Sequence, residues 1–208
     1  MKRLIAAALL FFAISASAVD RDEIVDSLVS VKLDGGAEQA GVLTMVKGDQ
    51  PQALVLLMPG DPGVTRAEVA DGKITNIRLR GHPFYRTRHL LVRPGLAAVL
   101  VDCRSDSGDT CKETYVLSKA RTDDVARMLA VVKQQLPTVK KVWVAGHSYG
   151  GHTSASMARY GEGVIDGAIS ASPVLGQNKT YSGLIGWDYS AAKVPQLFIS
   201  QRDVYSPH

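Results

Sequence analysis

The sequence has 208 residues, of which 46% are hydrophobic and 21% are charged. This length suggests one domain, and the ordinary composition excludes a fibrous or intrinsically disordered chain. The formal net charge is +4, and it falls to +2 when Lys2 and Arg3 are set aside, because 22 of the 24 basic residues then face 20 acidic ones. So small an excess excludes a protein that relies on charge to bind nucleic acid or an anionic membrane.

The first eighteen residues have the pattern of a bacterial signal peptide. Two basic residues precede an apolar run from Leu4 to Ile14, and Ala16-Ser17-Ala18 offers small residues where a signal peptidase cleaves. The run is shorter than the ~20 apolar residues that span a bilayer, which argues against the alternative of an uncleaved anchor. We expect cleavage after Ala18, a periplasmic or secreted protein without stable membrane insertion, and a mature domain of residues 19–208.

Continuous apolar runs predict buried strands, because strands covered on both faces need not alternate. Five such runs occur, at residues 53–58, 96–101, 141–145, 164–169 and 196–199. Residues 24–33 and 41–47 alternate more clearly and flank a Gly35-Gly36 turn. They predict a hairpin or meander at the edge of the sheet.

Helical patterns lie between the apolar runs. The clearest covers residues 118–136, where apolar side chains recur at spacings of three and four until Pro137 ends the pattern. Residues 83–92 and 149–160 are further candidates. Alternating strands and helices predict an α/β protein, a three-layer αβα sandwich around a mostly parallel sheet.

The two cysteines, Cys103 and Cys111, enclose a short polar segment typical of a turn. In an oxidising compartment an even cysteine count favours a disulfide over the alternative of two free thiols. A disulfide here would stabilise the fold by roughly 2–3 kcal/mol. Without nearby histidines the pair lacks the ligands of a metal site, and we expect none.

One local excess of positive charge interrupts an otherwise balanced chain. It consists of Arg78, Arg80, Arg86, Arg88 and Arg93. Apolar residues, glycine and proline are interleaved with these arginines, which favours a solvated surface over a binding site for an anionic polymer.

The segment Gly146-His147-Ser148-Tyr149-Gly150 has the pattern G-x-S-x-G. The pentapeptide carries little information alone, but here a predicted strand runs into it and a predicted helix runs out of it. A sharp turn there would hold the Ser148 hydroxyl above the carboxyl ends of the strands, and Gly146 and Gly150 would let strand and helix pass closely. The Tyr149 amide could then donate to a developing oxyanion. The alternative is a glycine-rich helix start with an inert serine.

This segment resembles the nucleophile elbow of the α/β-hydrolase fold family, and nearly the whole mature chain follows that family's order of elements. It is most similar to small dienelactone-hydrolase-like bacterial proteins. The resemblance implies that Gly60 or Asp61, in Met58-Pro59-Gly60-Asp61, gives the second oxyanion donor. It implies that Asp203, after the run at 196–199, is the catalytic acid, although the family's glycine is absent and the loop is one residue shorter. Asp188 and Asp102 are lesser candidates.

The family places its catalytic histidine after the acid and one more strand, but only five residues follow Asp203. His208 is downstream of Asp203, with no room for that strand. The other histidines, His82, His89, His147 and His152, are expected to pack or to line the pocket. We therefore expect a fragment that lacks the final strand, helix and histidine; a complete chain would favour a binding protein on a hydrolase scaffold.

These patterns together predict a secreted serine hydrolase that cleaves a small-molecule carboxylic ester, thioester or lactone through an acyl-enzyme on Ser148. An acyltransferase with the same nucleophile and a non-catalytic binding protein are the alternatives. No metal or organic cofactor and no nucleic-acid partner is expected. Loops 61–82 and 173–193 should shape the pocket, with Tyr181, Trp187 and Tyr189 either lining it or packing as part of a lid. Acyl length and oligomeric state stay open.

Overall fold

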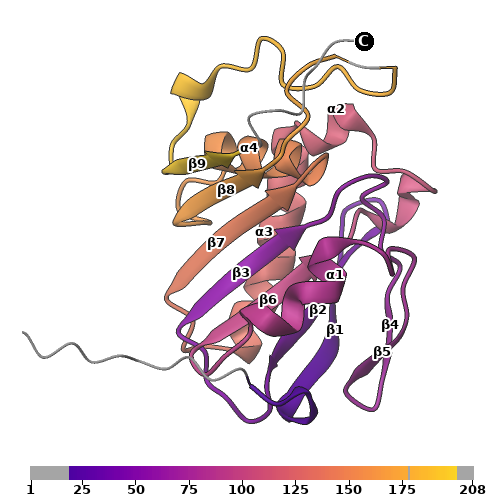
Figure 1. The fold of residues 1–208 in the computed structure, drawn as a ribbon, viewed down its shortest axis with the longest axis vertical. Helices are drawn as coiled ribbons and strands as arrows, with labels where there is room; N and C mark the ends of the chain where they lie inside the picture. The colour runs from indigo at the N-terminus through magenta and orange to yellow at the C-terminus, as the bar shows by residue number, and fades with distance from the viewer. Residues whose placement is uncertain (1–18, 178, 201–208) are drawn as a thin grey trace, which may run out of the picture.

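The fold is seen in a computed structural model that describes residues 19–177 and 179–200 (Figure 1). The expected signal peptide, Asp203 and His208 lie outside the described residues. Across the described ranges, no helix combines the length and apolar character needed to cross a bilayer.

A seven-stranded sheet forms the centre of the domain, in the order β1-β2-β6-β3-β7-β8-β9. The strands β6, β3, β7, β8 and β9 are parallel, and β2 is antiparallel to both β1 and β6. This confirms the mostly parallel sheet and the hairpin at its edge. The strands are β1 (Ile24–Lys32), β2 (Glu38–Val46), β3 (Ala53–Met58), β6 (Leu96–Val101), β7 (Lys141–His147), β8 (Gly167–Ala171) and β9 (Gln196–Ile199).

The predicted strands agree with the observed ones to within two residues, except that β2 begins three residues before the predicted range and β8 begins three residues after the apolar run that predicted it. The cause at β8 is the preceding turn. The backbone amides of Val164 and Ile165 both donate to the carbonyl of Gly161, at 2.9 and 3.0 Å, so these apolar residues close the end of a helix before the strand begins.

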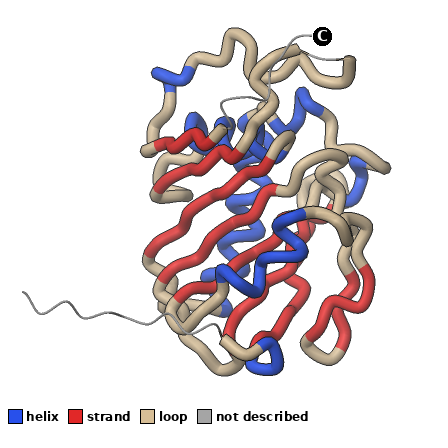
Figure 2. The backbone as a smooth tube through the Cα atoms, in the orientation of Figure 1, coloured by secondary structure: helices blue, strands red, loops and turns tan. Residues whose placement is uncertain are grey.

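Helices cover both faces of the sheet, which confirms the three-layer αβα arrangement (Figures 1 and 2). On one face α3 and α4 pack against the strands and enclose the larger core. The hydroxyl of Ser118 accepts a hydrogen bond from the Arg121 amide at 3.2 Å and caps the start of α3. The helices are α1 (Pro83–Leu91), α2 (Glu113–Val116), α3 (Lys119–Gln135) and α4 (Gly150–Tyr160), with short 3-10 turns η1 (Arg21–Glu23), η2 (Ser105–Ser107) and η3 (Tyr189–Ala191).

The opposite face is covered more loosely, by α1, which buries none of its residues fully. A half-buried ion pair attaches this helix to the sheet, because Arg88 on α1 lies 2.7 Å from Asp26 on β1. Thr44 on β2 donates a further hydrogen bond to Asp26 at 2.6 Å. The expectation that all five clustered arginines are solvated is therefore wrong for Arg88, whose charge is used inside the fold.

The sequence did not predict a second, two-stranded sheet made of β4 (Glu68–Ala70) and β5 (Lys73–Asn76). Its strands are short and mostly polar, so they carry no apolar run. The turn between them is Asp71-Gly72, and both residues have positive φ, 51° and 72°. An Asp-Gly pair of this kind is a strong hairpin signal, and it was the one indication that the sequence offered.

We expect Met128→Ala to lower the free energy of unfolding by about 2–5 kcal/mol, because the Met128 side chain is fully buried between α3 and the sheet. Urea denaturation followed by circular dichroism would measure the change. Gln134→Ala, at an exposed position of the same helix, is the control and should change it by less than about 0.5 kcal/mol. Equal losses in the two variants would contradict the assigned core.

Candidate active site

Ser148 stands on a sharp turn between the end of β7 and the start of α4. Its φ is +52°, in the left-handed region that a residue with a side chain rarely adopts. Two backbone hydrogen bonds fix the turn: the Ser148 amide donates to the carbonyl of Ala171, and the Gly151 amide donates to the carbonyl of Ser148, both at 2.9 Å. The predicted strand–turn–helix setting is confirmed, with the backbone strain that such a turn requires.

The glycines around Ser148 are required by close backbone contacts. A Cβ atom on Gly146 would overlap the carbonyl oxygen of Gly150, and one on Gly150 would overlap the carbonyl oxygen of Met58. A Cβ on Gly151 would lie only 2.7 Å from that of Pro173. Three segments therefore meet at the turn with no space for side chains: β7, the end of β3 and the segment after β8.

The loop after β3 runs directly beside the nucleophile. A Cβ atom placed on Gly60 would lie 3.3 Å from the Cβ of Ser148 and 3.2 Å from Nε2 of His82. The Gly60 amide donates to that same nitrogen at 2.7 Å, so it is already engaged. Among the described residues the backbone amides of Asp61 and Tyr149 have no acceptor. Of the three predicted oxyanion donors, Tyr149 and Asp61 are therefore the two with a free N–H.

His82 is the histidine that the structure places against this loop. Its Nδ1 lies 3.1 Å from the Phe84 amide and caps α1, while its Nε2 faces the Gly60 amide. A neutral imidazole has one acceptor nitrogen, so the ring accepts from only one of these amides at a time. Burial, and then the neighbouring His147, lower the pKa of His82 to about 4, so the ring is neutral at pH 7.

His147 and His152 make packing contacts. The ring centroid of His147 lies 5.4 Å from that of His82 and 6.1 Å from that of Phe84. His152 is fully buried, and its Nε2 lies 3.0 Å from the Val174 carbonyl, as expected for a structural residue. Within the described chain no histidine is hydrogen-bonded to Ser148. His208, like Asp203, lies outside the described residues.

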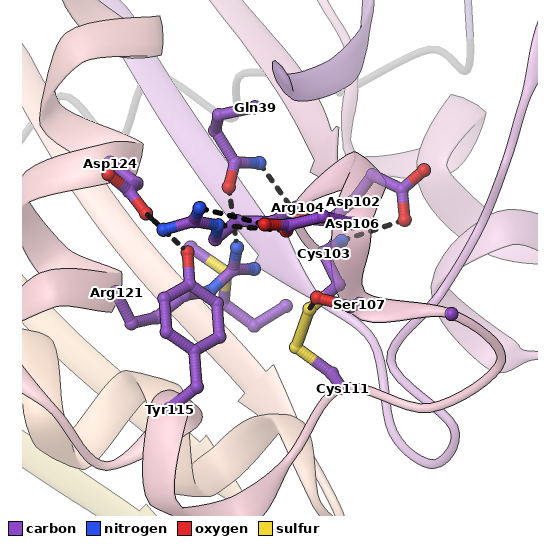
Figure 3. Close-up of a disulfide and its surroundings, with 12 residues drawn as sticks. Gln39, Asp102, Cys103, Arg104, Asp106, Ser107, Cys111, Tyr115, Arg121 and Asp124 are labelled. Carbon is purple, nitrogen blue, oxygen red and sulfur yellow. Dashed lines mark hydrogen bonds and ion pairs between the residues drawn. A yellow bond between two sulfur atoms is a disulfide. The ribbon is translucent and has the colours of Figure 1, made fainter. Parts of the chain in front are cut away.

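The predicted disulfide between Cys103 and Cys111 is confirmed (Figure 3), and Cys111 contacts both the loop after β3 and Tyr149. The Cys111 amide donates to the carbonyl of Pro62 at 2.8 Å, and its carbonyl accepts from the Tyr149 hydroxyl at 2.7 Å. Tyr149 is 1% exposed, and burial raises the pKa of its hydroxyl. The Cys111 backbone thus joins the loop after β3 to the residue that follows Ser148, and the disulfide ties Cys111 to the end of β6.

Asp102 is a structural residue, although it was a lesser candidate for the catalytic acid. Its carboxylate accepts from the amides of Thr65, Arg66 and Cys103 at 2.7, 2.8 and 2.7 Å. The Arg66 guanidinium lies 3.3 Å from the same carboxylate. With both oxygens occupied, Asp102 fixes the far end of the loop after β3 and is not free to orient a base.

Of the remaining acid candidates, Asp188 precedes β9 in the chain, and Asp203 follows it and lies outside the described residues. Asp188 is exposed and accepts from the Ser190 amide at 3.0 Å, which caps η3. The carbonyl of Ile199, the last residue of β9, accepts from the Ser172 amide at 2.6 Å, just beyond Ala171 beside the turn. The strand that precedes Asp203 therefore ends close to the nucleophile, at the same edge of the sheet.

Arg121 is a residue near the site that the sequence analysis missed. Its side chain is 2% exposed, donates to Gln39 Oε1 at 2.7 Å and lies 3.9 Å from the sulfur of Met58 (Figure 3). No carboxylate pairs with it in the described part of the chain. A signal was present, because position 121 is four residues before Val125 on the apolar face of α3, where a charged residue is unusual.

Some aromatic residues of loop 173–193 pack against other side chains, and one lines a cavity, so both predicted roles occur. Tyr181 stacks on Tyr149 with ring centroids 4.3 Å apart, and Trp187 packs against Arg159. Tyr189 and Phe198 instead line an apolar cavity of about 310 Å³, completed by Pro173, Leu175 and Ser200. No group of three or more potential metal ligands gathers in the described residues.

Comparison with known proteins adds a family to this geometry. Residues 90–207, more than half of the chain, match the family described as serine aminopeptidase, S33 (Hydrolase_4). A search of curated protein sequences gave no match.

Solved structures share the fold. Brefeldin A esterase, a bacterial homologue of human hormone-sensitive lipase, is 20% identical with a TM-score of 0.51; the match covers 90% of this chain and 46% of that one. A cold-adapted esterase from an Arctic intertidal metagenomic library, bound to PEG, is 16% identical with a TM-score of 0.60, covering 88% and 74%. Its zinc-bound structure is also 16% identical, with a TM-score of 0.58, covering 87% and 72%. This chain therefore spans less than half the length of the first esterase.

The low pKa of His82 predicts that stability falls as the pH drops. In the unfolded chain the pKa is 6.5 and in the folded chain it is about 4, so between these values the unfolded state binds a proton that the folded state does not. The free energy of unfolding should therefore decrease from pH 6.5 to pH 4. Urea midpoints measured across this range would show it.

His82→Asn is the matched variant, because asparagine keeps an acceptor for the Phe84 amide but does not titrate. Its urea midpoint should depend less steeply on pH over this range. Some slope will remain, since the pKa values of His89 and His152 are also lowered, chiefly by burial. Identical slopes for the variant and the wild type would refute the assignment.

Proposed function

Because this chain belongs to the serine aminopeptidase S33 family of α/β-hydrolase-fold serine hydrolases, we propose that it cleaves an ester-like bond through an acyl-enzyme on Ser148. The observation that carries the proposal is the turn itself. A strained serine stands between β7 and α4, with the Gly60 backbone directly against its side chain. A hydroxyl held in this way is exposed to a substrate at the carboxyl edge of the sheet.

The proposed reaction has two stages. The Ser148 oxygen attacks the carbonyl carbon while a histidine outside the described residues takes the hydroxyl proton. The amides of Tyr149 and Asp61 then donate to the oxyanion, and one such donor is worth ~3 kcal/mol of barrier. Collapse of the tetrahedral intermediate expels the alcohol, which receives the proton from the histidine. Water, activated by the same histidine, attacks the acyl-enzyme and releases the carboxylic acid.

Asp203 is the proposed partner that orients this histidine. The support is its position in the chain, four residues after β9 ends at Ile199, next to the segment that contacts the nucleophile turn. Asp102 and Asp188 both have structural roles in the described residues, which favours Asp203 among the three acid candidates.

The apolar cavity at the ends of β8 and β9 favours an ester with an uncharged, apolar acyl or alcohol group. Its walls are Pro173, Leu175, Tyr189 and Phe198. Pro173 also contacts Gly151, one turn into α4 from Ser148, so the cavity adjoins the nucleophile. An apolar pocket with few polar groups is suited to such ligands.

Export is also proposed, on two features of the chain. The first eighteen residues have the pattern of a signal peptide, and the disulfide between Cys103 and Cys111 is of a kind that persists in oxidising compartments. The enzyme would then act on small-molecule esters in the periplasm or the medium.

A fluorophosphonate probe should label the full-length mature protein at neutral pH and should not label Ser148→Ala. In-gel fluorescence and mass spectrometry of the modified peptide would measure this. Ser154→Ala is the control, because Ser154 is a buried serine on the same helix whose hydroxyl donates to the carbonyl of Ile169. Labelling should be retained in that control; labelling of Ser148→Ala would remove the nucleophile assignment.

Ester cleavage and aminopeptidase activity are separated by a pair of chromogenic substrates. We expect p-nitrophenyl butyrate to be hydrolysed at least about a hundredfold faster than leucine p-nitroanilide, because an apolar cavity has no carboxylate to bind a free amino group. Release of the chromophore from both gives kcat/KM for each, with Ser148→Ala as the blank. Preferential cleavage of the anilide would show a peptidase instead.

A further inference from the structure

A second cavity, of about 430 Å³, lies on the face of the sheet that carries α1. Four segments form it: η1, the start of β1, the β4–β5 hairpin and α1. Basic residues from three of them converge there, namely Arg21 from η1, Lys73 from β5, and Arg86 and Arg88 from α1. A neighbouring hollow of about 350 Å³ shares Arg21, Arg86 and His89, which therefore stand between the two spaces.

The floor of this cavity is a rigid, internally neutral cluster around Asp26. The carboxylate pairs with Arg88 at 2.7 Å and accepts from the Thr44 hydroxyl at 2.6 Å and the Ile74 amide at 3.3 Å. The Arg88 side chain also lies over the ring of Tyr85, 4.8 Å from its centroid. Since Asp26 and Arg88 neutralise each other, the cluster fixes the shape of the cavity, and Asp22 is the acidic residue of the lining left beside Arg21, Lys73 and Arg86.

The other cations have little negative charge to balance them. Asp22, the second acidic residue of the lining, lies 3.9 Å from Lys73, and both side chains are largely exposed. Arg86 has no side-chain partner in the described part of the chain. Bringing like charges from separate segments to one hollow costs electrostatic energy that a bound anion would offset.

Arg21 is paired with the neutral ring of His89 and, among the described residues, not with a carboxylate. The Arg21 guanidinium lies 2.8 Å from Nε2 of His89, and this contact requires a neutral imidazole that accepts. Burial, followed by the charges of Arg21 and Arg88, lowers the pKa of His89 and keeps it neutral. Most donors of the Arg21 guanidinium are thus left for a ligand.

We propose that this cavity binds a small organic carboxylate, separately from the reaction at Ser148. Arg21 and Arg86 would contact the carboxylate, with Lys73 adding charge at the rim. Ile24, Ile74 and the ring of Tyr85 give the cavity an apolar wall for the body of the ligand. The cavity volume is large enough for a small organic molecule, and the apolar wall favours an organic carboxylate over inorganic phosphate.

The test is isothermal titration calorimetry with benzoate at low ionic strength, on the untreated protein and, in parallel, on protein treated with a fluorophosphonate. Blocking Ser148 keeps the carboxylate out of the nucleophile site. We expect saturable binding of one benzoate, with inorganic phosphate at least about tenfold weaker and neutral benzamide not bound. Absence of saturable benzoate binding would overturn the proposal.

Arg86→Gln should weaken benzoate binding about tenfold or more, because one charge-assisted hydrogen bond is lost. Arg93→Gln is the matched control: it removes the same charge from an exposed residue of the same arginine cluster that does not line the cavity, and it should change the affinity less than about twofold. Equal weakening by the two variants would show non-specific attraction. Fluorophosphonate labelling at Ser148 should be unchanged in both variants, so failure of this proposal is distinguishable from failure of the proposed hydrolase activity.

Discussion

The structure depends on one close backbone contact, between the start of α4 and the end of β3. No side-chain atom fits at Gly150, because the Met58 carbonyl oxygen occupies that space. The contact brings the loop after β3 beside Ser148, and it makes the left-handed turn at Ser148 the available path from β7 into α4. This steric constraint therefore helps to set both the turn at Ser148 and the position of the loop after β3.

Hydrogen bonds from buried polar groups fix the rest of the loop after β3 beside this contact. Asp102 fixes the far end of the loop after β3 through three backbone amides, and Cys111 joins the middle of that loop to the Tyr149 hydroxyl. Arg121 lies behind the same loop without a carboxylate partner in the described chain. Burying a charge in this way is unfavourable unless hydrogen bonds compensate, and here Gln39 and the ring of Tyr115 do so in part. The preorganisation of the loop is thus obtained at some cost in stability.

Most of the fold could be predicted because its strands are continuous apolar runs and its largest helix has a clear apolar stripe. The turn at Ser148 was predictable from its glycines, which leave a steric signature in sequence. The partners of single polar residues could not be predicted. Asp102 and Arg88 looked like a possible acid and a solvated cation, because the amides and the carboxylate that bind them come from distant segments. The β4–β5 hairpin was not predicted because its strands are too polar to form a continuous apolar run.

Helix α1, which buries none of its residues fully, has a consequence for motion. Segments with few buried apolar contacts open at a lower free energy than the whole domain, so the amides of α1 should exchange with deuterium well before those of α3. The neutral His82 ring accepts from the Phe84 amide of this helix or from the Gly60 amide, so each local opening of α1 also loosens the contact with the loop after β3. On warming, the loop beside Ser148 would then lose its fixed position before the domain unfolds, starting at the periphery of the sheet.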